Sequence, residues 1–243
     1  MQSILQSARP YIAALCGVLA LAPVATTVAY ASHSPAHGST AAALAKRPVP
    51  AVLKSAESNA EDIVGFALES KRAKMVGQTR QLKKAMNPST LAMLAASGVS
   101  RSTMADLKVR VDHVVAIGQT GSFIDVALAG NSVSELMPAV YARFTDPIPS
   151  QVLALDYLER EAQLRSIAND PARLHSVIVD LSRTWQVLQP GVLNTTGGDK
   201  AAATYTDHVA SMRQLAATSG KSLEREAIRG LELVDGLERL FTH

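Results

Sequence analysis

Tyr205, His208 and Met212 are the residues whose types and spacing come closest to a reactive site. They are three and four positions apart, so they share one face if the segment around them is helical. An imidazole and a thioether are ligands that suit copper. One hypothesis is therefore a copper-binding or other metal-binding protein that takes a third ligand from a neighbouring helix. The alternative is structural: Tyr205 and Met212 belong to an inward-facing apolar stripe, and His208 lies at its margin.

The sequence contains few other patterns that carry catalysis. It has no Gly-x-Ser-x-Gly elbow, no His-Glu-x-x-His zinc motif, no Glu-x-x-His pair and no Cys-x-x-Cys-His haem attachment. Acids two apart, such as Glu159 and Glu161, face different directions on a helix. We therefore expect a protein without catalytic activity and without a cofactor. An enzyme with an unrecognised site is a further alternative.

The charge distribution argues against a nucleic-acid partner. The formal net charge is only +3 at pH 7, whereas nucleic-acid-binding domains usually concentrate basic residues on one face. A basic run over 71–84 contains no acid and could contact anionic lipid headgroups weakly. We interpret this run instead as a solvated face that pairs with the acidic last helix.

The first 31 residues have the order of parts of a secretory signal peptide. Arg9 precedes an apolar run, Pro23 follows it, and Ala29 and Ala31 are the small residues of a peptidase site. We predict cleavage after Ala31 and a periplasmic or secreted bacterial protein. An uncleaved membrane anchor is the alternative, because the apolar stretch reaches the lower limit of about 17 residues for a span.

The predicted mature chain has no thiol, because its only cysteine, Cys16, lies in the signal peptide. It can form neither a disulfide nor a thiolate metal site. Residues 32–50 are rich in Ser, Ala, Pro and Gly, a composition that predicts a flexible leader between the signal peptide and the folded domain.

The domain over 51–243 is predicted to be all-α. Helix-forming residues dominate it, alternating β-branched runs are rare, and aromatic residues make up 4% of the whole chain. Amphipathic stripes joined by short breaks favour an antiparallel bundle of about five to seven helices with short additional ones. The predicted helices cover 51–87, 89–97, 102–129, 132–142, 151–168, 171–188, 200–218 and 222–241.

Trp185 is the only tryptophan and lies on the apolar stripe of the predicted helix over 171–188. A large aromatic side chain at such a position either anchors the core or lines a ligand pocket. The sequence thus leads to one main hypothesis, an exported, non-catalytic helical-bundle protein that binds a protein partner or a small ligand between its helices.

Overall fold

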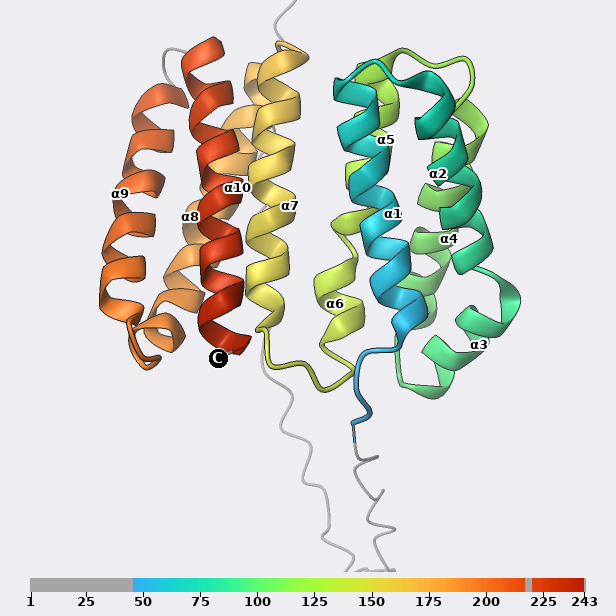
Figure 1. Cartoon of the computed structure of the whole chain (residues 1–243), viewed down its shortest axis with the longest axis horizontal. Coiled ribbons are helices and arrows are strands. Elements are labelled where there is room, and N and C mark those ends of the chain that lie inside the picture. The colour runs from blue at the N-terminus through green and yellow to red at the C-terminus, as the bar shows by residue number, and fades with distance from the viewer. Residues whose placement is uncertain (1–45, 217–219, 243) are drawn as a thin grey trace, which may run out of the picture. The chain divides into compact units, whose positions relative to one another are not determined.

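The computed structural model describes residues 46–216 and 220–242, and every regular element among them is an α-helix (Figure 1). The predicted all-α fold class is therefore confirmed. The predicted signal peptide, with Ala29 and Ala31, and most of the predicted leader lie outside the described residues. None of the described helices is both long enough and apolar enough to cross a bilayer.

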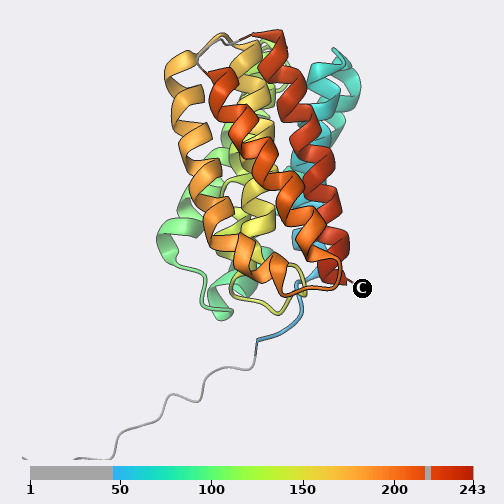
Figure 2. The same ribbon diagram turned by 90° about the vertical axis from the view of Figure 1, so that its left-hand side faces the viewer.

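The helices form two groups that meet at α7 (Figure 1). Figure 2 shows the orange and red C-terminal helices in front of the remaining ones. One group contains α1 to α6, and the other contains α8 to α10, while α7 packs against α5 and α6 on one side and against α8 and α10 on the other. Their bounds are α1 (Ala51–Leu68), α2 (Arg72–Ala85), α3 (Pro88–Ala96), α4 (Arg101–Ile117), α5 (Phe123–Ser134), α6 (Met137–Tyr141), α7 (Ser150–Ile167), α8 (Pro171–Leu193), α9 (Gly198–Ala216) and α10 (Lys221–Thr242).

Helix α7 takes part in two apolar cores. Leu164 packs into the core of the first group, and Leu155 packs into the core of the second. Because both sides of the helix are covered, its buried residues include Glu159 and Glu161. Buried carboxylates require partners within the protein, so α7 is where the fold brings polar side chains together.

The predicted single helix over 51–87 is wrong, because the chain turns back between α1 and α2. Ser70 has a φ of 58°, and the amides of Ser70 and Lys71 donate hydrogen bonds to the carbonyls of Ala67 and Phe66. This helix-ending motif usually has glycine at the left-handed position, so a serine there leaves no signal in the sequence. The predicted apolar stripe is nevertheless buried: Leu53, Ala56, Ala60, Ile63, Ala67, Met75, Leu82 and Met86.

The predicted helix over 102–129 is also wrong, because it is two helices, α4 and α5. Ser122 caps α5 by accepting a hydrogen bond from the Asp125 amide at 3.1 Å. Gly130 lies inside α5, where a Cβ atom would be 3.0 Å from Ile63 Cγ2. Glycine here therefore allows α5 to approach α1 closely and does not end a helix. The predicted helix over 132–142 is consequently reduced to α6.

The C-terminal helices lie closer to their predicted ranges. The Asp170 side chain accepts a hydrogen bond from the Arg173 amide at 3.1 Å, and α8 begins at Pro171 as expected. Helix α8 does not stop before Pro190 but continues to Leu193. Val192 is completely buried, so its packing holds the last turn in place despite the hydrogen bond that a proline removes.

Residues 46–50, predicted as the end of the leader, contact the helices. Val49 is buried, the Thr145 amide donates to the Arg47 carbonyl at 2.8 Å, and Pro48 forms an isolated β-bridge with Thr145. The described fold therefore includes a short segment that precedes α1.

The predicted pairing between the basic run over 71–84 and the last helix is wrong. The run lies on α2, which packs against α1 and α4, whereas α10 packs against α7 and α9. Lys83 instead pairs with Asp112 of α4. No ion pair within the described ranges joins α2 to α10.

Candidate functional site

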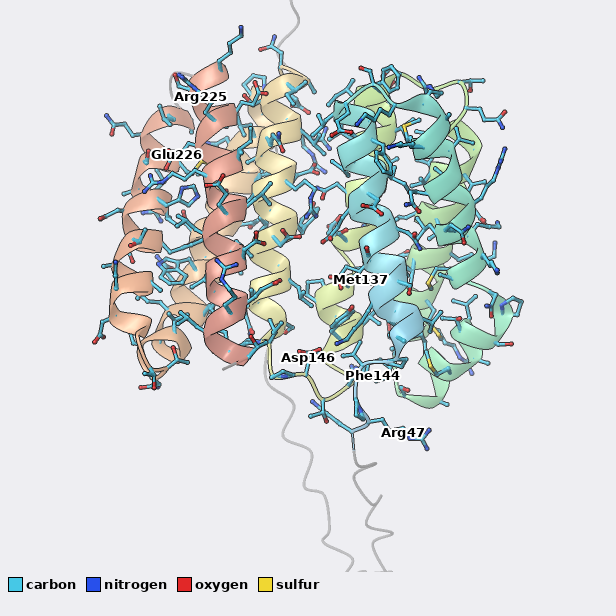
Figure 3. All side chains as sticks on the ribbon, in the orientation of Figure 1. Arg47, Met137, Phe144, Asp146, Arg225 and Glu226 are labelled. Carbon is cyan, nitrogen blue, oxygen red and sulfur yellow. The ribbon has the colours of Figure 1, made fainter. Side chains whose placement is uncertain are left out.

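His208 is the centre of a hydrogen-bond network that we call the buried network. Its other members are Glu159, Tyr205 and Glu226. Glu159 Oε1 lies 2.7 Å from His208 Nε2 and accepts a hydrogen bond from the Tyr205 hydroxyl at 2.8 Å. Glu226, labelled on α10 in Figure 3, places Oε1 2.9 Å from His208 Nδ1. Both ring nitrogens of His208 therefore face carboxylates.

The buried network favours a protonated histidine. The side chains of His208 and Glu159 have no exposed surface. Burial lowers the pKa of His208, but the interactions with Glu159 and Glu226 outweigh it and hold that pKa above its usual value. Burial raises the pKa of Glu159, and His208 and Tyr205 oppose this rise. An imidazolium between two carboxylates is the charge state that the geometry stabilises.

A glycine on α10 makes room for the buried network. A Cβ atom at Gly230 would lie 2.2 Å from Glu159 Oε2, so any larger residue would displace the carboxylate. That Oε2 atom is itself buried and has no hydrogen-bond partner among the described residues. The close packing of α10 on α7 therefore fixes the Glu159 side chain in the position where it meets His208.

Glu161 points away from the buried network, as predicted from its separation of two residues from Glu159. Its Oε2 accepts a hydrogen bond from Asn131 Nδ2 at 2.8 Å, and its Oε1 is 2.7 Å from Arg165 Nε. The two carboxylates thus serve different neighbours. Glu161 links α7 to α5, whereas Glu159 links α7 to α9.

The residues proposed as metal ligands on α9 have other neighbours. Tyr205 and His208 do share one face, and on that face they meet Glu159. Met212 is completely buried in the apolar core of the second group. Within residues 46–216 and 220–242, no three His, Cys, Asp or Glu side chains are arranged to hold a metal ion.

Trp185 packs beside the buried network. It is 3% exposed, its ring centroid lies 4.7 Å from that of Tyr205, and its Nε1 donates a hydrogen bond to Thr206 Oγ1 at 3.1 Å. These contacts are those of a core anchor on α8.

A second group of carboxylates lines a cavity of about 250 Å³ bordered by α1, α7 and α10, which we call the acidic pocket. Asp146, on the connection between α6 and α7, is labelled in Figure 3. The acidic lining residues are Glu57, Glu61, Asp146, Asp156 and Glu238; the others are Lys54, Ser58, Tyr141, Ile148 and Leu153.

Arg160 forms the ion pairs of the acidic pocket. Its Nη2 atom lies 2.7 Å from Asp156 Oδ2 and 3.3 Å from Glu61 Oε1. The Tyr141 hydroxyl donates a hydrogen bond to Glu57. Lys54 is the basic residue of the lining, and it is exposed. Arg239 also opposes the rise that burial causes in the pKa of Glu238. Five carboxyl groups therefore face three basic side chains, which leaves an excess of negative charge once the carboxyl groups are ionised.

Burial first, and repulsion between the carboxylates second, raise the pKa values in the pocket. Burial raises the pKa of Glu57 to about 7, although the Tyr141 hydrogen bond opposes the rise. Burial likewise raises the pKa of Glu61 to about 8 against the effect of Arg160. Burial, followed by repulsion from Asp156, raises the pKa of Glu238. Carboxyl groups that resist ionisation near neutral pH in a cavity are a common feature of binding and active sites.

No family model matches the chain, and neither a curated protein nor a solved structure shows significant similarity to it. The assignment of a function therefore depends on the geometry of the two carboxylate clusters.

Sequence reasoning identified His208 but not its partners, Glu159 and Glu226. One signal was available for Glu159, because it lies four residues after Leu155 and three before Ala162, on the apolar stripe of α7. A carboxylate on such a stripe indicates a buried acid with a partner. The acidic pocket had no comparable signal, since its residues are separated by up to about 180 positions along the chain.

Proposed function

We propose that this chain is an exported, non-catalytic helical-bundle protein that binds a small organic cation in the acidic pocket. The observation that carries the proposal is the convergence of five carboxyl groups on one cavity, near which the described residues place three basic side chains, Lys54, Arg160 and Arg239. Ammonium and guanidinium groups donate charge-assisted hydrogen bonds to carboxylates. An organic cation would therefore add the positive charge that the basic side chains near the pocket do not supply.

The size and lining of the acidic pocket favour a small molecule with a short apolar body. Its volume of about 250 Å³ lies just below the roughly 300–1,000 Å³ that is usual for drug-sized ligands. Ile148 and Leu153 add apolar surface between the acids. A diamine or triamine, in which methylene groups separate the charges, has both of the features that this lining can contact.

Binding should be coupled to the release of protons. A cation stabilises the ionised form of a nearby carboxyl group, whereas burial keeps the pKa of Glu57 at about 7 and that of Glu61 at about 8 without a ligand. Below pH 7 these groups must lose protons before they can pair with a cation. The affinity should therefore rise between pH 6 and pH 8.5.

Calorimetric titration of the purified protein with putrescine and spermidine tests this proposal. We expect both amines to bind at pH 8.5, spermidine more tightly, and the uncharged analogue 1,4-butanediol not to bind. Glu57→Gln and Glu238→Gln should each weaken binding roughly tenfold, because a hydrogen bond to a charged group contributes about 1.5–3 kcal/mol. The exposed Glu232 of α10 provides the control variant Glu232→Gln, which should bind normally.

Two results would contradict the assignment of the acidic pocket. One is equal loss of affinity in the Glu232→Gln control, which would indicate general attraction to an acidic helix. The other is an affinity that is the same at pH 6 and pH 8.5, because the protons on Glu57 and Glu61 would then play no part.

The export component has its own test. We infer cleavage after Ala31 from the order of charged, apolar and small residues at the start of the chain. Mass spectrometry of protein recovered from the periplasm of a bacterial host should show an amino terminus at Ser32. Recovery of the uncleaved chain in the cytosol would contradict the export proposal and leave the binding proposal intact.

A further inference from the structure

We propose that a second cavity, at the end of α3, binds a single-chain amphiphile with an anionic head group. This cavity, which we call the basic pocket, has a volume of about 750 Å³ and is separate from the acidic pocket. The residues that line it are Lys46, Arg47, Pro48, Met93, Ala96, Ser97, Arg143 and Phe144.

Three segments that are distant in sequence build the basic pocket. The segment before α1 is fixed to the connection after α6, because Lys46 Nζ donates to the Ala142 carbonyl at 3.0 Å and Thr145 Oγ1 donates to the Lys46 carbonyl at 3.2 Å. Helix α3 contributes the third segment. Figure 3 labels Arg47 and Phe144, which lie on the two segments joined by these hydrogen bonds.

All the charged residues that line the basic pocket are basic. Within the described part of the chain, neither Arg47 nor Arg143 belongs to an ion pair. Residues 1–45 contain no Asp or Glu, so that part of the sequence offers no carboxylate to them. Two guanidinium groups and one ammonium group, without an acid in the lining, match a carboxylate, sulfate or phosphate.

The remaining surface of the basic pocket is mostly apolar. Phe144, which is 5% exposed, and the partly buried Met93 provide it together with Pro48 and Ala96. The Ser97 hydroxyl already donates a hydrogen bond to the Met93 carbonyl at 3.0 Å. An anion without an apolar body would leave this surface in contact with water, whereas an alkyl chain would cover it.

The volume also favours an amphiphile over a simple inorganic anion. About 750 Å³ falls within the usual range of roughly 300–1,000 Å³ for organic ligands. The basic residues lie on the exposed rim and Phe144 is buried, so the head group would contact the rim while the chain extends over Phe144 and Met93.

Binding of decanoate below its micellar concentration, measured by calorimetry on the purified full chain, tests this proposal. We expect decanoate to bind, acetate and inorganic phosphate to bind at least tenfold more weakly, and decyl maltoside, which has the same chain but no charge, also to bind more weakly. Arg47→Ala and Arg143→Ala should each weaken decanoate binding about fivefold, as expected for an exposed charge contact. Arg101→Ala, at the exposed start of α4, is the matched control.

A second variant tests whether the basic pocket selects a negative charge, and it leaves the core unchanged. Ala96 is exposed at the end of α3, so Ala96→Asp should fold normally and repel the anion, with a further loss of decanoate affinity. Phosphate binding as tight as decanoate binding would overturn the proposal in favour of a simple anion site. Cosedimentation with phosphatidylglycerol vesicles without decanoate binding would overturn it in favour of a membrane surface. Unchanged decanoate affinity in Arg47→Ala and Arg143→Ala would also overturn it.

Discussion

The buried network and the acidic pocket are built on the same two helices, yet their charges are balanced in different ways. In the buried network, α7 contributes Glu159 and α10 contributes Glu226. In the acidic pocket, α7 contributes Asp156 and α10 contributes Glu238. The third helix makes the difference. Helix α9 adds His208 to the buried network, whereas α1 adds Glu57 and Glu61 to the acidic pocket.

One pair of helices thus takes part in two clusters of carboxyl groups whose charges are compensated to different degrees. In the buried network, His208 lies between Glu159 and Glu226, and Arg229 Nη1 is 3.0 Å from Glu226 Oε1, so two cations face two carboxylates. In the acidic pocket, Arg160 compensates only part of the negative charge. Clusters whose charge is balanced internally stabilise the fold, and clusters with an excess of one charge favour a ligand of the opposite sign.

The largest expected effect comes from removing the cation of the buried network. His208→Leu leaves Glu159 buried without its charged partner and should lower the free energy of unfolding by about 3 kcal/mol, since breaking a buried pair costs about 3–5 kcal/mol. Urea unfolding at pH 6 measures this change, because His208, with its raised pKa, is protonated there. His175→Leu, at an exposed position on α8, should change stability by less than about 0.5 kcal/mol.

A smaller loss is expected from Gly230→Ala, which pushes a methyl group against the Glu159 carboxylate. Overpacking of this kind costs about 1–3 kcal/mol. The matched control is Gly236→Ala on the same helix, where the nearest atom to a new Cβ would be Arg239 Nη2 at 3.8 Å, so the higher helix propensity of alanine should stabilise the protein. In a Glu159→Ala background, Gly230→Ala should cost clearly less. Additive effects of the two substitutions would contradict the contact between these residues.

The acidic pocket should respond to pH in the opposite sense to an ordinary ion pair. The pKa of Glu57 in the folded chain, about 7, exceeds the usual value of 4.5. The unfolded chain therefore releases this proton first, and the stability of the folded state falls as the pH rises from about 5 to 8.

Glu57→Gln removes this proton and its pH dependence. The variant should be more stable than the unmodified protein at pH 8 by about 1 kcal/mol, a value reduced for solvent screening, and the two should be nearly equal at pH 5. Thermal unfolding across this pH range measures the difference. Glu232→Gln, an exposed control, should show no such trend, and a Glu57→Gln variant that is less stable at pH 8 would show that ionised Glu57 stabilises the fold.

The smallest expected effect is on the fluorescence of Trp185. This residue contacts Tyr205 and Thr206 near the buried network and does not line the acidic pocket. Saturating spermidine should therefore leave its emission maximum unchanged, whereas His208→Leu should shift the maximum to longer wavelength by loosening the core. A clear shift with spermidine in the unmodified protein would show that the two clusters are coupled.

Sequence patterns predicted the helices and their buried faces better than the places where the helices end. The apolar stripe over 51–87 is buried throughout, although the chain reverses at Ser70. The interruption between α4 and α5 and the continuation of α8 through Pro190 were missed for related reasons. Periodicity records which side of a helix is apolar, whereas a chain reversal depends on the packing of the segments that follow it.

The sequence by itself determined the all-α fold class, the opposite directions of Glu159 and Glu161, and the shared face of Tyr205 and His208, because helical spacing alone decides these relations. Only the tertiary structure decided that Glu159 and Glu226 meet His208, and that Glu57, Glu61, Asp156 and Glu238 line one cavity. These residues come from helices that are distant in sequence. Their meeting depends on how α7 packs between its neighbours, which local spacing cannot specify.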